Sequence, residues 1–110
     1  MLEAETYRIR AGVLELIAGI ALAEVHGVSG TGIRTDHPED LRKRKSLIKG
    51  VRAEAEDGKA AIDVDVNMEY GKDFIALARE AQERVTGAVE AMTGWEVVAV
   101  NVSVVGVNAP

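Results

Sequence analysis

A short basic run is the segment of this chain with the clearest capacity for binding chemistry. The run consists of Arg42, Lys43, Arg44 and Lys45. With Lys49, these side chains could contact the phosphates of a nucleic acid or of an anionic lipid. The chain as a whole carries a net charge of −5, so this basic segment stands on an otherwise acidic molecule. No aromatic residue interleaves the run, and the missing stacking platform argues against nucleic acid as the ligand.

Acidic residues recur at alternate positions in the segment that follows. The set comprises Asp63, Asp65 and Glu69, with Glu54 and Glu56 ahead of them. Clusters of carboxylate oxygens can bind Ca²⁺ or Mg²⁺. No loop here resembles an EF-hand, however, and a strand with one wet face normally carries such residues. We therefore interpret the set as the solvated face of a sheet, where Arg52 offsets part of the repulsion.

Residue types that usually perform catalysis or hold metals are scarce. The chain has no Cys, which excludes disulfides, thiol catalysis and Cys-based zinc sites. His26 and His37 lack the spacing of a metal pair, and the serines lie in no nucleophile motif. The glycines between Gly27 and Gly32 lack the Lys-Ser/Thr ending of a phosphate loop. We expect no catalytic residue, no metal and no cofactor.

The length of 110 residues fits one domain, and apolar residues make up 47% of it while aromatics contribute only 4%. Its core must therefore be built from Ala, Val, Ile and Leu. The longest apolar stretch, Ala11–Val25, contains Glu15 and Glu24 and is too short and too charged to cross a bilayer. The first residues lack the basic region of a signal peptide. These features predict a cytoplasmic protein that reaches a membrane only through a partner.

The second half of the chain has clear signals for strands, a turn and a helix. Val51–Asp57 and Lys59–Tyr70 alternate apolar and polar residues, and Asp57-Gly58 between them predicts a hairpin turn. Asp73–Thr93 has one apolar stripe at helical spacing, with Asp73 as its N-cap. Gly87 inside this helix costs about 1 kcal/mol relative to Ala, which suggests close packing at that position.

The last predicted strand is Trp95–Val105. We expect Val98, Val100, Val102 and Val104 on one of its faces. Val97 and Val105 then fall on the other face, which predicts a strand partly covered on both sides.

The first half is less regular. Arg8–Ala23 predicts a helix that is apolar on more than one side because of Leu16 and Leu22, so it can present a second face to another chain. Val28–Ile33 predicts a short strand, and a basic loop covers about residues 34–49. The resulting α-β-β-β-α-β order predicts an α+β two-layer sandwich, with two helices packed on one face of a mixed sheet.

An ordered set of residues resembles the alkaline-shock-protein family of bacterial envelope-stress proteins, which includes the Gls-type general stress proteins. In the first half the set is Ile17-Ala18, Ala21, Glu24-Val25, Gly27-Val28, Gly50-Val51, Ile62-Asp63-Val64 and Tyr70-Gly71. In the second half it is Gln82, Val85, Val89, Met92-Thr93-Gly94, Val97, Val100-Asn101-Val102, Val104 and Gly106-Val107. The similarity covers residues 1–110 as one alkaline-shock-like domain, except the basic loop. Trp95 departs from it, because the family usually has a smaller aliphatic residue there.

The resemblance implies a non-enzymatic cytoplasmic protein that self-associates, that is linked to cell-envelope homeostasis and that can be held near the membrane by a small anchor protein. It carries over no catalytic or cofactor residues. Our main hypothesis is therefore a structural or scaffold protein that acts through homo-oligomers and protein partners, with Trp95, Leu16 and Leu22 as candidate interface residues. The alternative is a module that binds polyanions through the basic residues 42–49. An enzyme is the least favoured class, because no nucleophile–base or metal set is visible.

Overall fold

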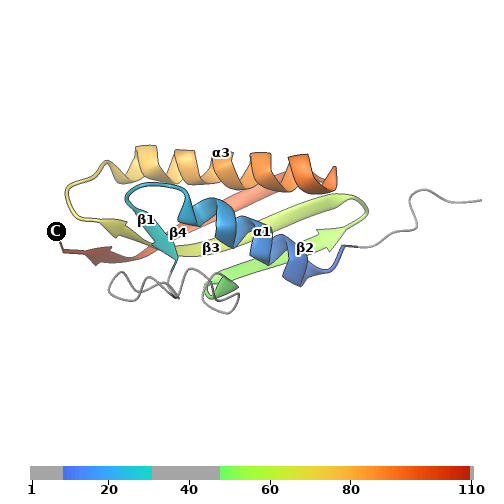
Figure 1. The fold of residues 1–110 in the computed structure, drawn as a ribbon, viewed down its shortest axis with the longest axis horizontal. Coiled ribbons are helices and arrows are strands. Elements are labelled where there is room, and N and C mark those ends of the chain that lie inside the picture. The colour runs from blue at the N-terminus through green and yellow to red at the C-terminus, as the bar shows by residue number, and fades with distance from the viewer. Residues whose placement is uncertain (1–8, 31–47, 110) are drawn as a thin grey trace, which may run out of the picture.

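The computed structural model describes residues 9–30 and 48–109, which form two helices and a four-stranded sheet (Figure 1). The elements follow the predicted α-β-β-β-α-β order. They are α1 (Ala11–Ala23), β1 (Val28–Gly30), β2 (Val51–Glu56), β3 (Lys59–Glu69), α3 (Phe74–Thr93) and β4 (Glu96–Asn108). The predicted fold class is confirmed, although α1 begins three residues later than expected and β4 runs three residues further.

β3 is the central strand of the sheet. On one side it pairs in parallel with β4, and on the other it pairs antiparallel with β2 along its first half and with β1 along its end. The backbone N–H of Asp65 donates to the carbonyl of Gly50 at 2.8 Å and bridges the gap between these two partners. The sheet is therefore mixed, as predicted, and both edges of β3 are occupied.

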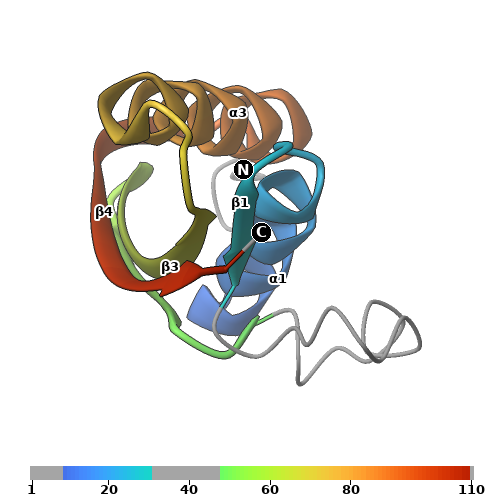
Figure 2. The same ribbon diagram turned by 90° about the vertical axis from the view of Figure 1, so that its left-hand side faces the viewer.

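The core lies between one face of this sheet and the two helices. Alternate residues of β3 point into it and are at most 1% exposed: Ala60, Ile62, Val64, Val66 and Met68. Leu14, Ala18 and Leu22 of α1 and Ala81, Val85 and Val89 of α3 pack on them from the other layer. Figure 2 shows both helices on the same side of the strands, α3 near β4 and α1 near β1. Burial of these small apolar side chains stabilises the fold by about 25 cal/mol for each Å² removed from water.

Local sequence signals account for the hairpin turn and for both ends of α3. Asp57 and Gly58 both have positive φ, 52° and 77°, which is the geometry of a two-residue hairpin turn with the twist that strands need. The Asp73 carboxylate accepts a hydrogen bond from the N–H of Ala76 at 3.1 Å and caps α3, as expected. Gly94 ends the helix with a φ of 74°, and its N–H donates to the carbonyl of Glu90.

The register of β4 differs from the predicted alternation. Two irregularities interrupt its pairing with β3, one at Val98 and one at Val105. Each inserts one extra residue and shifts the side chains that follow to the opposite face. Val97 therefore packs against the core with Val100 and Val102, whereas Val98 is more than half exposed. The prediction that Val98 shares a face with Val100 and Val102 was wrong for this reason.

Gly87 was also misinterpreted. A Cβ atom built at Gly87 would meet no atom within 4 Å, so the residue gives no close packing. Gly94 has equally open surroundings, but its left-handed backbone disfavours any side chain.

These two glycines make a matched pair of predictions. Gly87→Ala should raise the free energy of unfolding by about 0.5–1 kcal/mol, because alanine favours the helical backbone at an unhindered position. Gly94→Ala should lower it by about 1 kcal/mol, because of strain at the helix end. Urea titrations followed by circular dichroism measure both values. A loss of stability in Gly87→Ala would show that something does pack against this position.

Candidate functional site

The outer face of the sheet is polar, and several of its side chains are paired with each other. The guanidinium of Arg52 donates to both carboxylate oxygens of Asp65, at 3.2 and 3.3 Å. This hydrogen bond and the charge of Asp65 raise the pKa of Arg52 above its usual value. Asp63 accepts from the side-chain amide of Asn101 at 2.7 Å. Two of the acidic residues that sequence analysis singled out therefore already have partners within the sheet.

This arrangement supports the interpretation of a solvated face. Among the described residues, no three His, Cys, Asp or Glu side chains come close enough to hold a metal ion. The carboxylates of Asp63 and Asp65 lie on the same face of β3 but turn to different partners. The candidate metal ligands thus do not converge.

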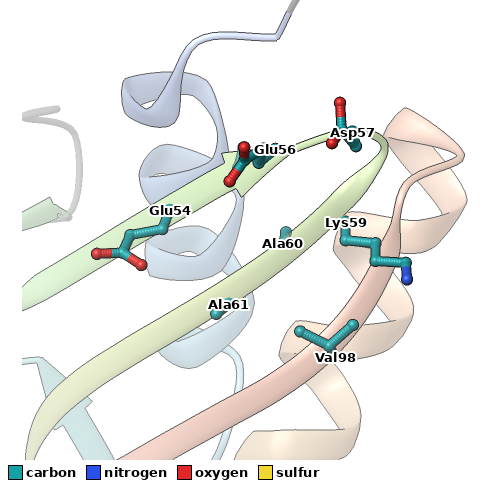
Figure 3. A pocket seen from close by; sticks show the side chains of 8 residues that line it. Glu54, Glu56, Asp57, Lys59, Ala60, Ala61 and Val98 are labelled. Carbon is teal, nitrogen blue, oxygen red and sulfur yellow. The ribbon is translucent and has the colours of Figure 1, made fainter.

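A shallow groove of about 490 Å³ lies at the β2–β3 hairpin, at the end of the sheet where β4 begins. Its polar side chains come mainly from the hairpin: Glu54, Glu56, Asp57 and Lys59. Figure 3 shows that the carboxylates of Glu54 and Glu56 extend from β2 while the Lys59 side chain extends toward Val98 on β4. Because these groups diverge, this groove does not assemble an acid–base pair or a ligand cage.

The basic residues chosen from the sequence are only partly placed. Arg42, Lys43, Arg44 and Lys45 lie outside the described residues, and so does the rest of the predicted loop up to residue 47. Lys49 is exposed in the turn that leads into β2. Polyanion binding by this segment therefore stays a prediction.

The three candidate interface residues lie in different environments. Leu22 is only 2% exposed and faces the sheet, so it is a core residue, and its assignment to an interface needs correction. Leu16 is half-buried on α1. Trp95 is also half-buried, and its backbone N–H donates to the hydroxyl of Thr93 at 3.1 Å. The exposed apolar side chains of α1 are instead Val13 and Ile20.

Sequence analysis missed a larger apolar surface on α3 and β4. Its exposed members at one end of the molecule are Tyr70, Ile75, Val104, Val105 and Val107. Tyr70 and Ile75 are each about two-thirds exposed, at 67% and 68%. The N–H of Tyr70 donates to the carbonyl of Asn108 at 2.9 Å, which places the residue after β3 beside the end of β4. The run of valines from residue 97 onward was the available signal, but alternation alone predicted a strand partly covered on both sides.

The two helices cap opposite edges of the sheet with polar side chains. On the β2 edge, the Glu15 carboxylate of α1 accepts from the N–H of Ala53 at 3.3 Å in a partly buried position. On the β4 edge, Glu90 accepts from the N–H of Val97 at 3.0 Å, and Gln82 donates to the carbonyl of Val100 at 3.0 Å. Side chains of the helices thus satisfy backbone groups that an edge strand leaves unpaired.

With this geometry in place, comparison with known proteins identifies the chain. The profile of the alkaline shock protein 23 family, which has a cell-envelope-related function, matches residues 2–109. The chain belongs to the alkaline shock protein 23 family. The resemblance found in the sequence is thereby confirmed, and the family is described by its relation to the cell envelope rather than by a reaction.

Individual relatives agree with this assignment. Over 98 residues the chain is 35% identical to "Uncharacterized protein Spy1535" of Streptococcus pyogenes serotype M6, covering 88% of this chain and 74% of that protein. It is 32% identical to the "Stress response regulator gls24 homolog" of Streptococcus pyogenes serotype M3, but spans only 55% of that protein. It is 30% identical to "Uncharacterized protein YqhY" of Bacillus subtilis, over 87% of this chain and 72% of the relative. No solved structure matches the chain significantly.

Neither α1 nor α3 is long and apolar enough to cross a membrane.

The Glu15 contact yields a stability prediction. Glu15→Ala should lower the free energy of unfolding by about 1 kcal/mol, because the partly buried N–H of Ala53 loses its acceptor. Glu83→Ala on the exposed side of α3 is the control and should leave stability within about 0.5 kcal/mol of the parent. Urea titration measures both. Equal values for the two variants would mean that the contact of Glu15 with the edge of β2 contributes nothing.

Proposed function

We propose that this member of the alkaline shock protein 23 family is a non-catalytic scaffold protein of the bacterial envelope stress response that works by self-association and by binding protein partners. The observation that carries the proposal is the amount of large apolar surface that this small domain leaves in contact with solvent. Within residues 9–30 and 48–109, the exposed large apolar residues are Val13, Ile20, Tyr70, Ile75, Met92, Val98, Val104, Val105 and Val107.

Such exposure is informative because the described part of the chain also has a well-buried apolar core. The fifteen core residues are at most 7% exposed. Single exposed apolar side chains are normal on a monomer, but contiguous apolar patches mark contact surfaces. Tyr70 and the exposed valines at the end of β4 lie at one end of the molecule. Apolar exposure of this kind supports association with other protein surfaces better than it supports chemistry on a small molecule.

The family supplies the biological setting of the proposal. Its function is related to the cell envelope, and one relative carries the name of a stress response regulator. We place this chain in the cytoplasm, assembled with further copies of itself and held near the envelope by a protein partner such as a small membrane anchor protein. In this proposal the domain supplies cohesion and binding surfaces, and no reaction.

Sedimentation over a concentration series tests the proposal. The weight-average mass should rise above the 11.7 kDa of one chain as the concentration increases through the micromolar range. Apolar contacts should keep this association at high salt, where surface ion pairs are screened. A chain that stays strictly monomeric at high micromolar concentration would rule out self-association as its mode of action.

A further inference from the structure

The outer edge of β4 has an open segment. β4 is the outermost strand in Figure 2, and among the described residues it pairs only with β3. Glu90 and Gln82 cap the N–H of Val97 and the carbonyl of Val100. Beyond Val100, no side chain in the described part of the chain hydrogen bonds to this edge.

The backbone groups left open can be identified from strand geometry. In a strand, the N–H and C=O groups of successive residues point to opposite edges, with a period of two. Val100 turns its carbonyl to the outer edge, where Gln82 reaches it. The pairing of β4 is regular from Ala99 to Val104. Val102 and Val104 therefore turn their N–H and C=O groups outward as well, and the side chains of Ser103 and Asn101 lie on the outer face of the sheet.

An apolar residue of α3 lies beside this open segment. The contacts Glu90–Val97 and Gln82–Val100 show that α3 runs antiparallel to β4 with one stripe of side chains toward it. Ile75 lies two turns before Gln82 on the same stripe, about 10 Å along the helix. The same distance along β4 from Val100 covers about three residues and reaches Ser103, between Val102 and Val104. Ile75, 68% exposed, and Val104, 40% exposed, thus share the helix side of the edge.

The open segment also lacks the charges that normally protect an edge. Glu96 is the only charged residue of β4, and it lies about 23 Å from Ser103 along the strand. On the neighbouring strand, Asp65 is ion-paired with Arg52 and Asp63 is bound by Asn101. Long, uncharged edge strands pair readily with other strands, and Lys or Pro is what usually prevents it. A second copy with a net charge of −5 could therefore approach β4 without facing an unpaired carboxylate of Asp63 or Asp65.

The geometry points to a second copy of this chain as the occupant, paired antiparallel along β4 across a two-fold axis at Ser103. This inference rests on the proposed self-association and names the surface responsible. Val102 of one copy lies opposite Val104 of the other in a hydrogen-bonded pair. The two-fold axis generates a second, equivalent pair between Val104 of the first copy and Val102 of the second. The N–H groups and carbonyls of Val102 and Val104 in both copies then find partners, which an identical strand supplies without any adjustment.

The side chains complete the contact. On the helix side of the axis, Ile75, Val102 and Val104 of both copies pack together.

Disulfide trapping tests the position of the axis, because the chain has no native cysteine. Across the proposed axis, Ser103 of one copy lies opposite Ser103 of the other in a non-hydrogen-bonded pair. Their Cα atoms are about 4.5 Å apart, which is within disulfide range. Ser103→Cys should therefore form a covalent dimer under mild oxidation. Asn101→Cys, two residues away on the same face, is the control. Its copies lie about 13 Å apart along the strands and should stay uncrosslinked.

A charge placed on the edge tests the energetics. Val104→Lys should weaken self-association by about tenfold or more, measured by sedimentation, with the thermal unfolding midpoint retained because Val104 is already partly exposed. Val98→Lys is the matched control. It adds the same charge at an exposed valine of the same strand but far from the axis, and should leave association unchanged.

The outcomes separate this inference from the proposed function. If the parent chain self-associates but Val104→Lys associates normally and Ser103→Cys does not crosslink, the β4 contact is wrong while self-association stands. If the parent chain stays monomeric, both fail. If the edge captures an extended peptide of another protein while the chain itself stays monomeric, the occupant is not a second copy and the inference is overturned.

Discussion

The burial of one face of β3 is the interaction on which the rest of this structure depends. Its five inward side chains are almost completely excluded from water, and α1 and α3 pack on them as well as against each other. Because aromatic residues are few, this core relies on close packing of small branched side chains. β3 can be buried in this way only if its backbone is paired on both edges, since unpaired N–H and C=O groups cannot be left in an apolar interior. β4 on one side and β1 with β2 on the other meet that requirement.

Pairing β3 on both edges leaves unpaired backbone N–H and C=O groups on the outer edges of β2 and β4. The two helices reach over to meet it in part, through Glu15 on β2 and through Gln82 and Glu90 on β4. These long polar side chains give hydrogen-bond partners to backbone groups of the edge strands, as neighbouring strands do for β3. The protection of β4 ends near its middle, where the strand has no charge and α3 presents Ile75 instead of a polar group. An edge that is only half protected suits the self-association proposed above, because its capped part resists uncontrolled pairing while its open part accepts one partner strand.

Much of this fold was predictable from local patterns. The alternation in Lys59–Tyr70, the Asp57-Gly58 turn and the cap at Asp73 each depend on neighbouring residues alone, and the structure has all three. The inward assignment failed in β4, because a bulge at Val98 depends on how the strand must bend to follow β3 and α3. Leu22 was misassigned for a similar reason. An apolar helix has no unique inward direction until the sheet beneath it is known. Likewise, nothing local indicates that Gln82 and Glu90 reach β4, since these contacts join residues brought together only by the crossover.

Amide hydrogen exchange at two protein concentrations tests the central claim most directly, namely that β3 is closed on both edges while β4 is open along Val102–Val104. The account predicts slow exchange for the amides of Ile62 and Val64 that does not change with concentration. It predicts fast exchange for Val102 and Val104 in dilute solution and slower exchange when the protein is concentrated. Amides of Val102 and Val104 that exchange at the same rate at both concentrations would contradict it.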